Sequence, residues 1–233
     1  LFGSASDDCA NAVQCASSAG QVRSGMALMG QRMGSGPHRT PTPTSPARIA
    51  PDRSNYLSSS MDLDPLKLSQ PERYKLLIGC IVPRPIAFVS TVSPDGDPNL
   101  APFSFFAGVG SDPMTLLFCP ANKPDGSEKD SLRNAKPISE GGVGEFVVNA
   151  ATEALARQVA AAAEPLEYGR SEFDLTGLTP VRSTRVRPPR VAESPVSFEC
   201  RTIQVIRTNP GVAAGGNIVL GQVVHVHIRD DLI

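Results

Sequence analysis

The sequence predicts a mainly β protein with antiparallel strands, arranged as a barrel or a sandwich, and a few short helices. Three observations predict this class. From Ile78 onward, short runs of strand-forming residues alternate with turn signals. The helical stretches are too few to supply the crossovers of a parallel sheet. Twenty-two prolines and no tryptophan in 233 residues also argue against a helical bundle.

The strand candidates are apolar runs bounded by glycine, proline and aspartate. Residues 86–92 are rich in strand formers and lead into Asp95-Gly96, a typical hairpin turn, so 99–106 is expected to pair back onto them. Further candidates are 114–119, 145–149 and the longest run, 217–228. Two helices are predicted, a short one near 129–136 and an alanine-rich one over 152–163.

Charge and composition exclude several classes of function. The 22 Lys and Arg against 23 Asp and Glu give a net charge of −1, so no basic excess indicates nucleic-acid binding. No apolar run approaches the roughly 20 residues of a membrane-spanning helix, so no membrane partner is expected. The five cysteines form no Cys-x-x-Cys pair, which favours a reducing, cytoplasmic setting over a disulfide framework.

Residues 1–60 differ in composition from the rest of the chain. They are rich in Ser, Pro and Arg and poor in acids, so we expect a disordered N-terminal extension before a compact domain at 61–233. Such a composition is also typical of an organelle transit peptide. We favour an upstream fragment or a gene-model extension, because the chain begins with Leu1 and Met61 would be a sensible start for the compact domain.

Few side chains are candidates for acid–base or metal chemistry. His225 and His227 are two apart on a predicted strand, so their side chains share a face at a spacing of about 7 Å. A metal would need a third ligand that the local sequence does not offer, so we predict a solvated or packing pair and no metal site. Cys80, Cys119 and Cys200 have apolar neighbours and are predicted to be buried core thiols.

The segment Lys129-Asp130-Ser131 precedes the short predicted helix. A lysine and a hydroxyl beside the free N–H groups of a helix start make a natural phosphate site. The alternative is a plain helix cap formed by Ser127 or Asp130 with solvated charges.

Eight segments together resemble, in order and spacing, the flavin reductase-like family. They are Val82–Thr91, Asp95-Gly96, Asn99–Phe106, Ser111–Pro113, Lys129–Asn134, Gly144–Asn149, Ser194–Cys200 and Gly221–His225. The resemblance implies an FMN-binding split β-barrel, antiparallel and of Greek-key type, that usually forms a homodimer. The chain stops at Ile233, inside or just after the last predicted strand, whereas members of the family generally continue, so we expect a truncated C-terminal end.

The resemblance also implies a cofactor site made from three parts of the chain. Arg84, Ser90 and Thr91 would reach the flavin phosphate or ribityl chain, and Lys129 and Ser131 would hold the phosphate. The remaining residues of the implied site are Asn99, Ala101, Pro102, Ser104 and Phe105, which would border the ring, and Asp130. A phosphate dianion requires cationic and hydroxyl donors together, and the ring requires an apolar wall with a few polar anchors.

Two functions follow from the resemblance. The first is a flavin reductase that transfers hydride from NADH or NADPH to FMN, with FAD as the alternative flavin, and supplies a partner monooxygenase. The second is a non-catalytic FMN carrier or electron-transfer protein. Because the flavin performs the difficult chemistry, the sequence identifies no catalytic side chain.

Overall fold

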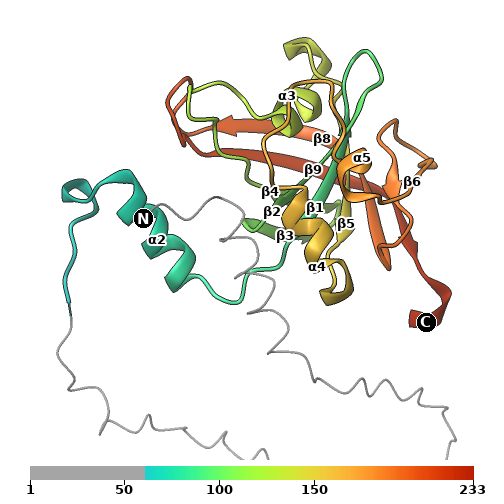
Figure 1. Ribbon diagram of the computed structural model, residues 1–233, viewed down its shortest axis with the longest axis horizontal. Helices are drawn as coiled ribbons and strands as arrows, with labels where there is room; N and C mark the ends of the chain where they lie inside the picture. Colours follow the sequence, from blue (N-terminus) through green and yellow to red (C-terminus); the bar gives the residue numbers. More distant parts are fainter. Residues whose placement is uncertain (1–60) are drawn as a thin grey trace, which may run out of the picture. The chain divides into compact units, whose positions relative to one another are not determined.

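The computed structural model describes residues 61–233. The α-helices are α2 (Gln70–Cys80), α3 (Asp130–Ala135), α4 (Ala156–Ala161) and α5 (Glu172–Thr176), and 3-10 turns lie at 65–67, 138–140, 153–155 and 230–232. The strands are β1 (Ala87–Val92), β2 (Pro98–Phe103), β3 (Phe106–Ser111), β4 (Met114–Phe118), β5 (Glu145–Ala150), β6 (Pro180–Val181), β7 (Arg190–Val191), β8 (Val196–Arg207) and β9 (Asn217–Ile228). Figure 1 shows their arrangement.

Seven strands form one sheet in the order β2-β1-β5-β8-β9-β4-β3, and every neighbouring pair is antiparallel. The β1–β2 hairpin turns at Asp95-Gly96, as the sequence predicts, and Gly96 has a φ of 107°, which a side chain would strain. The Ser93 N–H donates to the Asp97 carbonyl at 2.9 Å and closes the turn.

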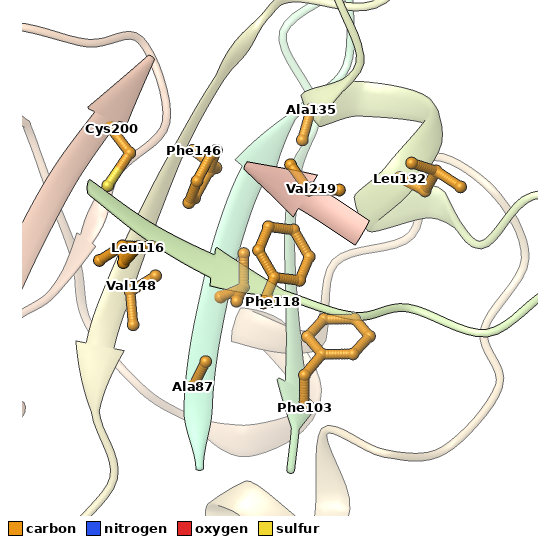
Figure 2. Packing of buried hydrophobic residues seen from close by; sticks show 11 residues of the cluster. Ala87, Phe103, Leu116, Phe118, Leu132, Ala135, Phe146, Val148, Cys200 and Val219 are labelled. Carbon is orange, nitrogen blue, oxygen red and sulfur yellow. The ribbon is translucent and has the colours of Figure 1, made fainter. Parts of the chain in front are cut away.

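The sheet curls so that its two ends meet over a shared core. Phe103 of β2 and Phe118 of β4 stand near opposite ends of the strand order, yet their ring centroids are 5.1 Å apart. Phe118 also meets Phe146 of β5 edge to face at 5.1 Å. Leu132 and Ala135 of α3 point into the same core (Figure 2). The sheet is therefore a barrel whose interior is filled by side chains.

A second core lies on the outer face of the hairpin. Successive strand residues point to opposite faces, so Ala87 and Val89 enter the barrel while Phe88 faces outward. Phe88 packs with residues of β2, the 153–155 turn, α4 and α5, among them Leu100, Leu155, Val159 and Phe173. All six residues of β1 are consequently buried. The strand that carries two candidate site residues is thus fixed from both sides.

The edge strand β2 presents few free N–H groups. The Leu100 N–H points away from β1 and donates to the Glu172 carboxylate of α5 at 2.8 Å. The outward positions on either side of it are Pro98 and Pro102, which have no N–H. This arrangement protects the edge from pairing with another strand.

Most predicted elements are confirmed, with shifted bounds. The predicted helix over 152–163 is a 3-10 turn followed by the six-residue α4. Helices α2 and α5 were not predicted. Cys80 was predicted to be buried but is exposed, because it ends a helix that buries none of its residues. The predicted extension at 1–60 lies outside the described residues, and within 61–233 no helix is long and apolar enough to cross a membrane.

Candidate functional site

A buried cluster of hydroxyl and amide groups joins β1, β2 and α3. The Asn99 amide donates to the Thr91 hydroxyl at 3.2 Å and to the Ser131 hydroxyl at 3.1 Å. The Asn134 amide donates to the same Thr91 hydroxyl at 3.2 Å. All four side chains are buried. Three predicted site residues, from segments up to 40 positions apart, are therefore brought into contact.

The cluster continues to the surface through Tyr168. The Tyr168 hydroxyl donates to Oδ1 of the Asn134 side chain at 3.2 Å, and the Arg133 guanidinium lies 3.7 Å from the centre of the tyrosine ring. A shallow concavity opens beside these groups, lined by Ser93, Asp97, Pro98, Asn99, Asp130, Asn134, Tyr168, Gly169 and Arg170. The buried amides thus lie beneath a polar surface depression.

Half-buried residues at the end of β2 form a neighbouring wall. Ala101, Pro102, Ser104 and Phe105 are all partly exposed. The exposed Lys129 places its Nζ 5.9 Å from the centre of the Phe103 ring, which is itself part of the core. A cation therefore lies next to an aromatic ring at the end of β2, close to where α3 begins.

Neither predicted capping residue caps α3. Lys129 itself is the N-cap residue and its side chain makes no capping bond. The Ser127 hydroxyl donates instead to Asp125 at 2.6 Å, and Asp130 pairs with Lys123 at 2.8 Å. The capping prediction was wrong because both side chains have nearer partners in the preceding loop.

Two of the predicted site residues outside the cluster, Ser90 and Arg84, bond to other parts of the chain. Ser90 is fully buried on the opposite face of β1 from Thr91, where its hydroxyl donates to the Pro189 carbonyl. Arg84 is half-buried and donates through one terminal nitrogen to the carbonyls of Ile78 and Ile81. Its Nε is buried and has no hydrogen-bond partner among the described residues.

The two strand histidines are in contact with each other. The ring centroids of His225 and His227 are 4.6 Å apart, and His227 Nε2 lies 2.5 Å from the Glu199 carboxylate. Burial opposes ionisation of Glu199, but bonds from the Thr184 N–H, His227 and the Arg185 N–H outweigh it and lower the pKa of Glu199. Among residues 61–233, no group of three His, Cys, Asp or Glu side chains is placed to hold a metal.

The remaining described cysteines are placed differently from each other. Cys200 is buried in the barrel core as predicted, and burial raises the pKa of its thiol far above the ordinary value. Cys119 is half-buried, and burial raises the pKa of its thiol as well. Both thiols are therefore protonated and weakly nucleophilic near neutral pH.

The sequence reasoning missed Asn134, Tyr168 and Glu172. Asn134 could have been found, because it stands three residues after Ser131 and so lies on the same face of α3. Tyr168 and Glu172 come from a segment in which no helix was predicted. Burial raises the pKa of Glu172, which the Leu100 N–H partly opposes, and the Asp130 charge adds to the rise.

Comparison with known proteins identifies the family. The family model described as flavin reductase like domain matches residues 78–233. An uncharacterized protein of Halalkalibacterium halodurans is 40% identical over 173 residues, 74% of this chain and 80% of that protein. The crystal structure of nitrilotriacetate monooxygenase component B from Bacillus cereus is 32% identical with a TM-score of 0.70, covering 76% of this chain and 85% of that one. For 2-nitrobenzoate 2-nitroreductase from Pseudomonas fluorescens the identity is 27%, the TM-score 0.63 and the coverage 74% and 79%.

The chain belongs to the flavin reductase-like family of oxidoreductases. The split β-barrel that the sequence resemblance implied is confirmed, with its antiparallel strands and few short helices.

The residues present fit a flavin nucleotide. Lys129 supplies an exposed cation, and the half-buried wall of β2 supplies an apolar surface for a flat ring. The unpartnered Nε of Arg84 is a donor available to an anionic or carbonyl acceptor.

Proposed function

We propose that this protein is an FMN-binding flavin reductase that accepts hydride from NADH or NADPH. The observation that carries the proposal is the buried contact of Thr91, Asn99 and Ser131, which joins three segments of the family match next to the exposed Lys129. These contacts preorganise the surface above them, and preorganisation limits the entropy lost when a ligand binds.

The residues divide into two roles in this proposal. Lys129 and Arg84 bind the flavin phosphate or ribityl chain through charge-assisted hydrogen bonds. The ring is bordered by Ala101, Pro102, Ser104 and Phe105. The buried hydrogen bonds among Thr91, Asn99 and Ser131 fix the positions of the segments that carry these residues.

A bound flavin would supply the hydride chemistry, with the nicotinamide as the hydride donor. The protein orients the two reactants and excludes water from the face of the ring. With a flavin bound, the backbone N–H groups of Ser104 and Phe105, which follow β2, would stabilise negative charge on the ring, because fixed dipoles need no reorganisation as charge develops. No acid or base side chain is required, in agreement with the buried, protonated state of Cys200.

We also propose that the reduced flavin serves a partner monooxygenase and that the chain acts as a homodimer in the cytoplasm. The similarity to a monooxygenase component B supports the partner. The second edge strand, β3, is largely exposed and carries Val109, and β4 carries the exposed Met114 beside it. Such an edge is suited to contact with a second copy.

An NAD(P)H oxidation assay with added FMN tests the proposal. We expect the full chain to oxidise NADH or NADPH well above the rate of free flavin, and K129A to raise the KM for FMN. K75A, which removes an exposed lysine from α2, is the matched control. Activity no greater than that of free flavin, with FMN bound, would favour the FMN carrier or electron-transfer protein instead. The same assay with FAD in place of FMN tests which flavin the protein uses.

A further inference from the structure

The segment between β6 and β8 carries an uncompensated run of arginines. From Pro180 to Ala192 the chain has four arginines, Arg182, Arg185, Arg187 and Arg190, and no acidic residue. The described residues 61–233 contain 20 acidic and 17 basic residues in total. The segment is therefore a basic surface on an otherwise acidic domain.

The backbone of this arginine loop, residues 182–190, is fixed to the outer face of the barrel. The Glu199 carboxylate accepts from the Thr184 N–H at 2.7 Å and the Arg185 N–H at 2.6 Å. Glu145 of β5 accepts from the Arg187 N–H at 2.8 Å. The two carboxylates therefore hold the backbone of the loop in place by accepting hydrogen bonds from its N–H groups.

Further contacts fix the end of the loop. The Asn149 side chain accepts from the Val191 N–H at 3.0 Å, and Ser90 donates to the Pro189 carbonyl. Ser183, Val186 and Pro188 are buried between the arginines. The loop is a preorganised support rather than a random coil.

The four arginine side chains are exposed to different degrees. Arg182, Arg185 and Arg187 are exposed and Arg190 is half-buried. None of the four forms an ion pair with a carboxylate of residues 61–233. Arg207 and Arg229 elsewhere in the domain each pair with carboxylates at 3.0 Å or less. Guanidinium groups that pair with no carboxylate of the described residues, on a backbone fixed in this way, are ready to bind acidic groups of another molecule.

The arginine loop also lies next to the candidate site. Arg187 donates to the Pro94 carbonyl at 3.3 Å, in the β1–β2 turn. Ser93 and Asp97 of the same turn line the concavity above the buried cluster. A molecule held on the loop would therefore stand beside the mouth of the site.

We propose that the arginine loop is a docking surface for an acidic protein, the acceptor that receives reduced flavin or its electrons. Charge complementarity of this kind steers transient partners and raises their association rate. An extended nucleic acid is disfavoured, because the acidic remainder of the domain would repel it. A dinucleotide is disfavoured because none of the four arginines lines the concavity beside the candidate site. We infer that the partner is acidic from the arginine loop alone. The inference that this partner accepts reduced flavin rests on the proposed function.

Fluorescence anisotropy with three labelled probes tests the proposal on the full chain. The probes are a twelve-residue Glu/Gly peptide, a Lys/Gly peptide of the same length and a twelve-nucleotide oligouridylate. We expect the acidic peptide alone to bind at low ionic strength and to be released by salt. R182Q/R185Q should weaken it about fivefold, since each exposed charge pair contributes roughly 0.5 kcal/mol. R182K/R185K, which keeps the charges, should bind the acidic peptide with an affinity within about twofold of the wild-type affinity.

The control K75Q/R157Q removes two exposed charges from α2 and α4 and should leave binding of the acidic peptide unchanged. Three results would each overturn the proposal. They are no binding of the acidic peptide, equal weakening of its binding by R182Q/R185Q and by K75Q/R157Q, and tighter binding of the oligouridylate than of the acidic peptide. FMN titration of the same samples separates the two hypotheses. If FMN does not bind but the acidic peptide does, the proposed function fails and the acidic docking surface stands.

Discussion

Asn149→Asp should destabilise the fold at neutral pH and recover in acid. Asn149 is fully buried and uses its whole amide: Nδ2 donates to the Phe88 carbonyl at 3.0 Å and to Ser90, and Oδ1 accepts from the Val191 N–H and the Ser197 hydroxyl. Aspartate keeps the shape but places a carboxylate oxygen against the Phe88 carbonyl. An uncompensated buried charge of this kind costs about 3–5 kcal/mol.

The sign of the pH dependence follows from the same geometry. The folded protein favours the protonated acid, which donates to the Phe88 carbonyl as the amide does, so the pKa of the new carboxyl is raised in the folded state. The loss of stability is then greatest at pH 7 and shrinks as pH falls through that raised value.

Urea denaturation of the variant and the wild type at pH 7 and pH 5 measures this loss of stability. Asn209→Asp, at an exposed loop position, is the control and should change the unfolding free energy by less than about 0.5 kcal/mol. A deficit below about 1 kcal/mol at pH 7, or the same deficit at both pH values, would refute the reasoning.

Two further predictions concern stability. Gly221→Ala should cost about 1–3 kcal/mol in urea denaturation, because the added Cβ would lie 2.4 Å from the ring of Phe146 in the packed core; an unchanged midpoint would show that the ring moves freely. Glu172→Gln should become more stable relative to wild type as pH rises above 4.5, because burial raises the folded-state pKa of Glu172 and the wild type loses stability as it ionises. A stability difference independent of pH between 4.5 and 8 would contradict that explanation.

Strands β1, β2, β4, β5 and β9 were predictable because their signal is local, whereas β3, β6, β7 and β8 were not predicted. The apolar run of β1 and the turn at Gly96 specify a hairpin within about fifteen residues. Helix α5 was missed because its five residues are too few for a periodic pattern, and its position depends on packing against Leu100 and its neighbours. Helix α2 was also missed; it buries none of its residues, and its apolar side chains Tyr74, Leu76 and Leu77 are exposed.

The candidate site was only partly predictable for a related reason. The family motifs include Thr91 and Ser131, and the structure brings these two residues together through Asn99. Ser90 was included with Thr91, although strand alternation directs consecutive side chains to opposite faces. The Glu199–His227 contact depends on the pairing of β8 with β9, which no local pattern shows.

An equilibrium titration with FMN tests the central claim most directly. The full chain, K129A and the control K75A are each titrated while quenching of the flavin fluorescence is recorded. The account predicts saturable quenching in wild type and K75A, and an affinity about tenfold lower in K129A, since a charge-assisted hydrogen bond contributes roughly 1.5 kcal/mol. Absence of saturable quenching in the folded protein, or equal affinity in all three, would contradict the claim that the surface beside Lys129 binds flavin.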